Sequence, residues 1–402
     1  MHKKRIAILV NSLSAGGAER VVANLLTSLR DEYDLHLLLL RDEIDYAVPP
    51  GQRVEFLSSE REGGSAPGSN LLRLPVVAWR LKRYCAENSV DLVLSFLNRP
   101  NLAAGLAKVL GMKAKVIMSE RAFTPSFYDP STLRGRFAGL LVSCLYRYAD
   151  AILPNSEGTR RALEEVYGIK NEYLVVHNPV DVAAIATASE EDVPDMDRSR
   201  FTFVCVAGFR EQKNHSMLVE AFARLGDADA RLLLIGKGPT IEDIKEQIAS
   251  RGLGERVVFL GQVDNPHKYV AKSDCFVLAS DFEGFPNVVL ESLACGTPVI
   301  STDCPTGPAE ILDPSLHEKL TKGSVHHGEF GVLVPVRDAQ ALSRAMTEML
   351  SDAKLRERYG PAGRRRSLDF DSGSKNDPFR FAIERVLQDR SFDSAEQTAS
   401  IV

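Results

Sequence analysis

Two glutamates separated by seven residues stand in the segment 282–300, which reads FEGFPNVVLESLACGTPVI. Glu283 precedes a Gly-Phe-Pro-Asn sequence, and Glu291 lies inside an apolar run that ends in Cys-Gly-Thr-Pro. A carboxylate accepts hydrogen bonds from two hydroxyls at once, and the neighbouring hydroxyls of a hexose or a ribose suit it. We therefore predict that Glu283 contacts a sugar and that Glu291 contacts a ribose.

A helix is expected to start between these two glutamates. Asn287 is a residue type that caps helices, and Pro286 stands directly before it, so the helix should begin near Val288. The amides of a first helical turn lack partners within the helix and favour a phosphate. The residues predicted to bind a diphosphate at this turn are Phe285, Pro286, Asn287 and Val288.

Two cations follow another apolar strand, in the sequence FTFVCVAGFREQKN (201–214). Lys213 is a compact charge suited to phosphate, and Arg210 carries a planar fork of donors. If these cations and the helix amides bind a diphosphate, the two carboxylates are left to bind hydroxyls. This division of roles predicts a nucleotide sugar as the ligand.

Pairs of glycines follow two predicted strands, in NSLSAGGAERVV (11–22) and in RLLLIGKGP (231–239). Glycine lets a backbone approach a ligand closely, and the helix that follows the first pair offers amides to an anion. Neither segment is a complete dinucleotide fingerprint, and a purely structural turn explains each pair as well. The candidate ligand-contacting glycines are Gly16, Gly17, Gly236 and Gly238.

Short apolar runs alternate with helical patterns along the chain, which predicts parallel sheets built from right-handed βαβ units. The predicted strands are 6–10, 35–40, 91–96, 114–118, 151–154 and 173–176, and then 201–206, 231–235, 257–260, 275–278 and 298–301. We expect an α/β protein with two Rossmann-like, doubly wound domains that face each other across a cleft, with ligands at the carboxyl ends of the strands.

The predicted domains are 1–180, 181–370 and a C-terminal segment, 371–402. The polar stretch SEEDVPDMDRSR (189–200) has the composition of an interdomain linker.

Composition excludes several classes of protein. The 402 residues carry a net charge of -5, so the chain as a whole lacks the basic footprint of a nucleic-acid-binding protein. No apolar run approaches the ~18–20 residues of a membrane span, and the first apolar run is too short for a signal peptide. Six cysteines without a CxxC pair favour reduced core thiols in a cytoplasmic protein and predict no metal site.

Eight segments together resemble one family. They are GGAER (16–20), SERAFTP (119–125), NPVD (178–181), EQKNH (211–215), GKGP (236–239), FLGQVDNP (259–266), EGFPNVVLESLACGTPVISTDCPTGPAEIL (283–312) and GVLVPVRD (331–338). The chain resembles retaining, nucleotide-sugar-dependent glycosyltransferases of the GT-B fold, in the group named for its glutamate–seven residues–glutamate motif. Among these it is similar to bacterial enzymes that build surface polysaccharides, lipopolysaccharide and lipid-linked oligosaccharides.

The resemblance implies transfer of a hexose or N-acetylhexosamine, from a UDP-sugar above other donors, to a glycan or polyprenyl-diphosphate-linked acceptor. It implies that the second domain binds the donor, with Val263 among the contacts, and that the first binds the acceptor. It also implies that the C-terminal helix, near 377–387, crosses back onto the first domain, and that no metal or other cofactor is needed.

This chain departs from the family at two places. Where the family commonly has Gly-Arg, it has Ala207-Gly208, and Arg210 replaces the phosphate-binding arginine only approximately. Where many members carry a histidine near the sugar, it has Ser119-Glu120-Arg121. The incoming hydroxyl could then give its proton to the leaving phosphate oxygen. Glu120 either orients the acceptor or forms an ion pair with Arg121.

The segments 70–85 and 131–150 of the predicted acceptor domain mix large apolar residues with arginines. This mixture is typical of helices that lie on an anionic membrane surface, although helices that cover a Rossmann-like sheet also show it. We expect a cytoplasmic protein that associates peripherally with the inner face of the cytoplasmic membrane.

Two other functions use the same fold. A sugar-nucleotide epimerase would release the nucleotide and an epimerised sugar without an acceptor, and a non-catalytic subunit would bind the sugar nucleotide without turning it over. An NAD-dependent dehydrogenase is disfavoured, because no full glycine fingerprint with an acidic residue about 20 positions later is present.

Overall fold

The structure, a computed structural model, describes residues 3–14, 16–60, 73–127, 131–193, 196, 199–372 and 377–392. The chain divides into two compact units. The first unit is Met1–Asn178 with Ser374–Val402, and the second unit is Pro179–Gly373.

The first unit contains a six-stranded parallel sheet with the order β3-β2-β1-β4-β5-β6. Its strands are β1 Arg5–Val10, β2 Asp34–Arg41, β3 Arg53–Glu60, β4 Leu92–Phe96, β5 Lys115–Glu120 and β6 Ala151–Pro154. Most are unbroken apolar runs, as expected for strands covered on both faces. The strand order reverses between β1 and β4, which creates a crevice at their carboxyl ends.

For this sheet, one strand prediction was wrong and one strand was missed. The predicted strand 173–176 is only a bridge between Tyr173 and Ile152. The edge strand β3 was not predicted, because its sequence RVEFLSSE alternates charged and apolar residues in a short, polar context.

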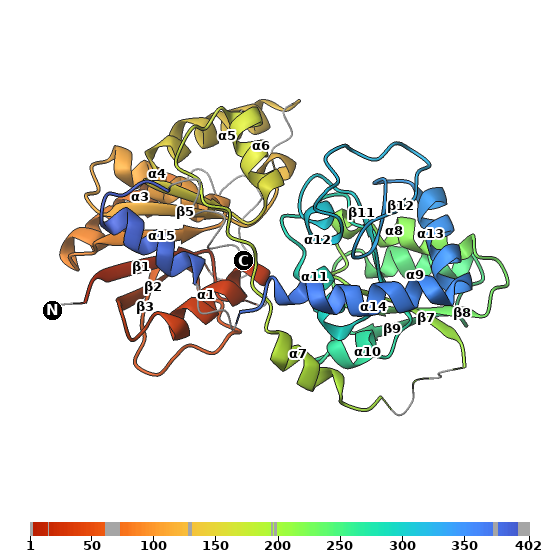
Figure 1. The fold of residues 1–402 in the computed structure, drawn as a ribbon. Helices are drawn as coiled ribbons and strands as arrows, with labels where there is room; N and C mark the ends of the chain where they lie inside the picture. Colours follow the sequence, from red (N-terminus) through yellow and green to blue (C-terminus); the bar gives the residue numbers. More distant parts are fainter. Residues whose placement is uncertain are drawn as a thin grey trace. The chain divides into compact units, whose positions relative to one another are not determined.

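Helices cover both faces of the first sheet. They are α1 Gly17–Ser28, α3 Leu74–Glu87, α4 Asn98–Val109, α5 Leu133–Leu145, α6 Glu157–Tyr167 and α15 Pro378–Leu387, with short 3-10 turns at Thr124–Phe127 and Tyr146–Tyr148. Ala7 and Leu9 of β1 share a core with α3, α4, α5 and α6, whereas Ile6 and Ile8 share one with α1 and α15. Figure 1 shows α15, near the end of the chain, lying along this first sheet.

The second unit contains a seven-stranded sheet with the order β12-β13-β11-β10-β7-β8-β9. Its strands are β7 Phe201–Val206, β8 Ala230–Ile235, β9 Val257–Gly261, β10 Cys275–Leu278, β11 Val299–Thr302, β12 His326–His327 and β13 Val332–Val334. All neighbours pair in parallel except β12 with β13. The order reverses between β7 and β10, so the crevice of this sheet lies at their carboxyl ends.

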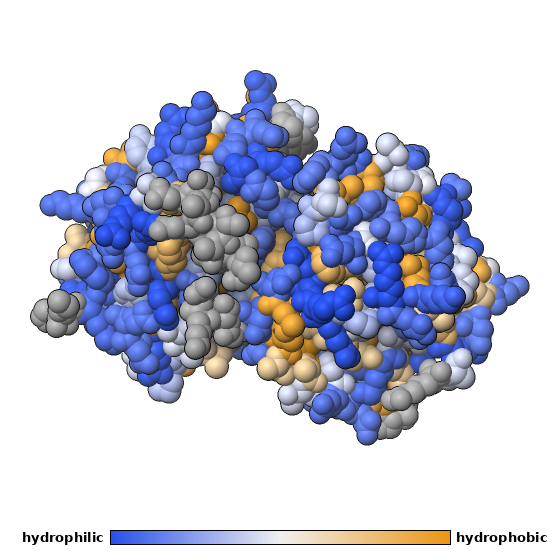
Figure 2. Space-filling view, viewed as in Figure 1, coloured by the Kyte–Doolittle hydropathy of each residue, from blue (hydrophilic) through white to orange (hydrophobic). Residues whose placement is uncertain are grey.

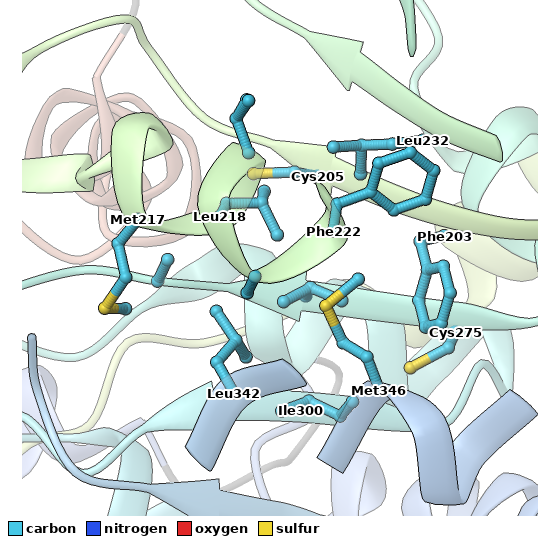
Figure 3. Packing of buried hydrophobic residues seen from close by; sticks show 14 of the residues in the cluster. Phe203, Cys205, Met217, Leu218, Phe222, Leu232, Cys275, Ile300, Leu342 and Met346 are labelled. Carbon is cyan, nitrogen blue, oxygen red and sulfur yellow. The ribbon is translucent and has the colours of Figure 1, made fainter. Parts of the chain in front are cut away.

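The helices of the second unit are α7 Val182–Ser189, α8 His215–Ala223, α9 Ile241–Ser250, α10 His267–Ala271, α11 Asn287–Cys295, α12 Pro308–Leu312, α13 Ala339–Ser351 and α14 Ala353–Leu368, with the 3-10 turn η3 Glu211–Lys213. Phe203 and Cys205 of β7 pack with Phe222 of α8 and Met346 of α13 in one core, which Figure 3 shows. Val204, which points to the other face, packs with α11 in a second core.

The stretch 189–200 was predicted as an interdomain linker, and this prediction was wrong. It lies within the second unit, between α7 and β7. Val193 and Met196 pack against the core that contains Phe276, and the carboxylate of Glu191 pairs with Lys268. These contacts hold a polar sequence against the unit.

All six cysteines are free thiols, and five of them are buried. Cys144, on α5, is exposed, so the prediction of core thiols holds for the other five. In the described ranges, no helix combines the length and the apolar character required to cross a bilayer.

Candidate active site

The crevice of the second sheet brings together two of the predicted catalytic residues. Lys213 lies in η3, after β7, and Glu283 lies after β10. The Lys213 ammonium (Nζ) and the Glu283 carboxylate oxygen Oε1 are 2.5 Å apart, and the two side chains are 20% and 8% exposed. The pair therefore stands at the place where a doubly wound sheet binds its ligand.

Further hydrogen bonds hold Glu283 in place. The Ser280 hydroxyl, fully buried, donates to the same Oε1 atom at 2.6 Å. The Thr306 hydroxyl donates to the backbone carbonyl of Glu283. Ser280 is itself fixed, because the Thr302 hydroxyl donates to its carbonyl at 2.5 Å. The carboxylate is thus oriented before any ligand binds.

The helix predicted between the two glutamates exists, but its cap was predicted wrongly. Helix α11 begins at Asn287 itself, and Pro286 is the N-cap residue with an extended ψ of 103°. A proline before the first turn fixes the chain direction without a side-chain cap. Glu291 lies one turn further on, within the buried part of the helix.

The glycines after β8 are required by the packing of the protein itself. A Cβ atom on Gly236 would overlap the Ala207 carbonyl oxygen, and one on Gly238 would overlap the Phe209 carbonyl oxygen. The loops after β7 and β8 therefore touch through their backbones. This contact accounts for both glycines without a ligand, so a role in donor binding stays a prediction.

Three other predicted donor contacts, Val263, Phe285 and Arg210, differ in how far they are buried. Val263 is half-buried and packs against the core of the second unit, and Phe285 belongs to that core. The Arg210 side chain is exposed and makes no cap hydrogen bond at the start of η3. The backbone of Arg210 is engaged, since its carbonyl accepts from the Lys213 amide at 2.9 Å.

In the first unit, Gly16 and Gly17 lie at the crevice between β1 and β4. Gly16 is the N-cap residue of α1, and its carbonyl accepts a hydrogen bond from the Tyr46 hydroxyl at 3.1 Å. Leu97, which follows β4, has a positive φ of 72°. For a bulky residue this conformation is strained, and such strain clusters at functional sites.

Glu120, the last residue of β5, is fully buried. Its Oε2 atom accepts a hydrogen bond from the Tyr146 hydroxyl at 2.6 Å. Within the described part of the chain, no ion pair joins Glu120 to Arg121, so that alternative is wrong. The Arg121 guanidinium instead donates to Ser119, to the Val176 carbonyl and to Asn178. A role for Glu120 in orienting the acceptor stays a prediction.

Burial raises the pKa of Glu120 to about 7, although the hydrogen bond from Tyr146 acts in the opposite direction. Between pH 4.5 and pH 7 the Glu120 carboxyl therefore keeps its proton in the native protein and loses it in the unfolded chain. The free energy of unfolding consequently falls as pH rises from 4.5 to 7. Glu120→Gln, which is neutral and still accepts from Tyr146, should be more stable than the wild type at pH 8 by up to roughly 3 kcal/mol.

Urea unfolding at pH 5 and pH 8 measures this difference. The gain of Glu120→Gln should be larger at pH 8, whereas Glu87→Gln, an exposed control on α3, should show no such dependence. Equal stabilities of the variant and the wild type at both pH values would contradict the buried-proton assignment.

Three residues around Glu283 were not predicted from the sequence: Ser280, Asp281 and Thr306. Ser280 and Asp281 stand directly before the glutamate motif, and their position after a strand was a usable signal. Thr306 comes from a distant loop, so only the fold reveals it. In the stretches that the structure covers, no cluster of three or more His, Cys, Asp or Glu side chains is arranged to hold a metal ion.

One cavity, of about 460 Å³, lies away from both crevices. It is found at the amino ends of β1, β2 and β3, and its lining includes Lys3, Arg5 and Arg53. Since ligands of doubly wound sheets bind at the opposite, carboxyl edge, we do not assign the donor to it.

Comparison with known proteins identifies the family. The family description "Glycosyltransferase Family 4" matches residues 15–184, and "Glycosyl transferases group 1" matches residues 189–366. A relative from Campylobacter jejuni, N-acetylgalactosamine-N,N'-diacetylbacillosaminyl-diphospho-undecaprenol 4-alpha-N-acetylgalactosaminyltransferase, is 34% identical over 370 residues, which are 92% of this chain and 96% of the relative. The chain therefore belongs to the glycosyltransferases that these two descriptions name, group 1 and family 4.

Solved structures show the fold of this glycosyltransferase. Sucrose-phosphate synthase from Thermosynechococcus elongatus superposes with a TM-score of 0.79 at 19% identity, covering 96% of this chain and 99% of that one. Anabaena Alr3699/HepE in complex with UDP superposes with a TM-score of 0.70 at 18% identity, covering 94% and 99%. The predicted family, its GT-B fold and the prediction of an enzyme are confirmed.

Proposed function

We propose that this glycosyltransferase moves a hexose or N-acetylhexosamine from a nucleotide sugar, with a UDP-sugar favoured, to a lipid-linked or glycan acceptor. We further propose that the anomeric configuration is retained and that the product enters the synthesis of a surface polysaccharide, lipopolysaccharide or related glycan. The observation that carries the proposal is the ion pair of Lys213 and Glu283 in the crevice between β7 and β10.

The proposed chemistry divides the charges of this pair between two parts of the donor. Without a ligand, Glu283 neutralises Lys213. When the donor binds, the Lys213 ammonium and the first turn of α11 stabilise the diphosphate, and Glu283 accepts hydrogen bonds from hydroxyls of the sugar. Preorganised donors of this kind, aimed at the charge that develops on the leaving group, are usually the largest contribution to catalysis.

In the transfer step, the bond between the anomeric carbon and the phosphate oxygen breaks, and the electron pair stays on the phosphate. The acceptor hydroxyl oxygen bonds to the anomeric carbon on the same face, and its proton passes to the phosphate oxygen. No protein base is required in this step. We propose that no metal ion is needed either, as the family resemblance implies, so that EDTA should leave the rate unchanged.

The choice of donor and acceptor follows from the relatives. The Campylobacter relative is named as an N-acetylgalactosaminyltransferase that acts on a diphospho-undecaprenol-linked saccharide. One solved structure of the same fold holds UDP. These names support a UDP-N-acetylhexosamine as donor and a polyprenyl-diphosphate-linked glycan as acceptor.

We also propose that the enzyme lies peripherally on the inner, cytoplasmic face of the membrane, through helix α5. Three apolar side chains repeat along this helix: Leu133, Phe137 and Leu140 are 84%, 56% and 58% exposed. Arg134 and Arg136 accompany them, and the sequence has no Asp or Glu from 131 to 149. Such a helix suits the interface of an anionic bilayer. The face seen in Figure 2 is mostly hydrophilic, with hydrophobic residues in small, separate groups.

Replacing two of these apolar residues should release the enzyme from membranes. We expect the double variant Leu133→Ser and Phe137→Ser to lower the partition coefficient onto phosphatidylglycerol vesicles at least ~10-fold, because two apolar side chains no longer enter the bilayer. Co-sedimentation measures the partition. Val166→Ser, which changes an exposed apolar residue on α6, is the matched control. If the double variant and the control sediment alike, α5 is not the contact.

The experiment that tests the function is a donor panel. The purified enzyme is incubated with UDP-, GDP- and ADP-sugars, with and without a bacterial lipid extract, and nucleotide release is followed. We expect release that requires both one UDP-sugar and the extract, and proton NMR of the product should show the donor's anomeric configuration. Release without the extract would favour the epimerase, and binding without release under any condition would favour the non-catalytic subunit.

A further inference from the structure

Asp281 lies two residues before Glu283 and joins three segments of the second unit. Its Oδ1 atom accepts from the Asn214 side-chain amide at 2.9 Å. Its Oδ2 atom accepts from Arg337 Nε at 2.9 Å and lies 2.8 Å from Arg337 Nη2. Its backbone amide donates to the Gln212 carbonyl at 2.8 Å. One carboxylate thus connects the loops that follow β7, β10 and β13.

Both side chains that hold Asp281 belong to residues with a left-handed backbone. Asn214 has a φ of 46°, and Arg337 has a φ of 56°. Asparagine adopts this left-handed conformation readily, but for a bulky residue such as Arg337 it is unusual and persists only where surrounding contacts enforce it. Two such residues meet at one carboxylate, beside the proposed catalytic pair.

Stability alone does not explain the arrangement. The Arg337 side chain is 76% exposed, and an ion pair so open to solvent contributes little to the stability of a fold. Asn214, by contrast, directly follows Lys213 and ends η3. The Gln212 side chain also donates to the Phe282 carbonyl at 2.7 Å, so Gln212 joins η3 to the turn that carries Glu283 through both its side chain and its backbone. The contacts of Asp281 therefore bear on where the Lys213 ammonium lies.

We propose that Asp281, held by Arg337, is a positioning residue that fixes Lys213 against Glu283 for the leaving diphosphate. Asp281 acts through Asn214 and the turn η3 and does not touch the reacting atoms. Arg337 fixes the second carboxylate oxygen and so prevents Asp281 from turning away. The inference rests on the proposed function, because it assumes that Lys213 binds the diphosphate of a donor.

A double-mutant cycle tests the inference. Misplacing a catalytic group by about 1 Å costs roughly 100-fold in rate, so Asp281→Ala should lower kcat roughly 10–100-fold and change the KM for the donor less than about threefold. In the Lys213→Ala background, Asp281→Ala should cause no further loss, since the residue acts through Lys213. Arg337→Ala should act in the same direction with a smaller effect. Arg200→Ala, which removes an exposed ion pair with Asp229 in the same unit, should keep the wild-type kcat.

Multiplicative losses in the double variant would overturn the inference, because they would show that Asp281 acts independently of Lys213. A second readout needs no turnover. A crystal structure of Arg337→Ala, an exposed change that should not impair folding, should show Lys213 Nζ withdrawn from Glu283 Oε1. An unchanged separation of 2.5 Å would overturn the inference whether or not a nucleotide sugar is the donor. A wild-type enzyme that turns over no donor, with the pair displaced in the variant, would instead refute the proposed function and leave only the structural part of the inference, that Asp281 and Arg337 hold Lys213 against Glu283.

Discussion

Replacing Lys213 with alanine should lower kcat ~100–1000-fold, because one preorganised donor to the leaving group is lost. The Lys213 ammonium pairs with Glu283 when no ligand is bound, and in our account it contacts the diphosphate of the donor during the reaction. The variant should also bind free UDP more weakly, since the lost contact is made to the phosphates. Steady-state nucleotide release and a calorimetric titration with UDP measure the two effects.

Lys245→Ala is the matched control for this variant. Lys245 lies on α9 of the same unit and pairs with Glu242 at the surface. The control should keep the wild-type rate, and circular dichroism should show that both variants are folded. A Lys213→Ala enzyme with the rate and the UDP affinity of the wild type would remove Lys213 from the site.

Replacing Glu283 with glutamine should lower kcat/KM for the donor roughly 10–100-fold, which corresponds to the loss of hydrogen bonds to a charged group. Glutamine keeps the shape of the side chain and can still accept from the Ser280 hydroxyl, so the turn should stay in place. What it loses is the charge that strengthens hydrogen bonds to the sugar hydroxyls.

The two variants should differ in their response to free UDP. Because Glu283 is assigned to the sugar, Glu283→Gln should bind UDP, which has no sugar to transfer, within about threefold of the wild type while turnover falls. Lys213→Ala should lower both the affinity for UDP and the turnover. Glu242→Gln, an exposed exchange on α9, is the control. Loss of UDP binding in Glu283→Gln that equals the loss in Lys213→Ala would contradict the division of roles.

Much of the fold could be predicted because buried parallel strands are continuous apolar runs. The runs at 6–10 and 201–206 correspond to β1 and β7, and the alternation with helices predicted parallel order. Edge strands lack this signal, since one side of each is solvated, and β3 and β12 were missed. The buried interior strand β13 was missed as well, because it spans only three residues. The segment 173–176 is apolar enough for a strand but forms only a bridge, so its composition misled the prediction.

The catalytic pair was accessible from the sequence, whereas the residues that support it were not. Lys213 and Glu283 were found because each follows a strand and has the chemistry that a sugar nucleotide requires. Arg337 and Thr306 come from loops far along the chain, and no local pattern connects them to Glu283. Glu120 was found as a carboxylate, but only the fold shows that Tyr146 rather than Arg121 is its partner.

The measurement that tests the central claim most directly is a crystal structure of the enzyme with UDP or an intact UDP-sugar. Our account predicts the diphosphate at the carboxyl ends of β7 and β10, with a phosphate oxygen about 3 Å from Lys213 Nζ and the helix α11 directed at the phosphates. A diphosphate bound elsewhere, for example in the cavity lined by Lys3, Arg5 and Arg53, would contradict it.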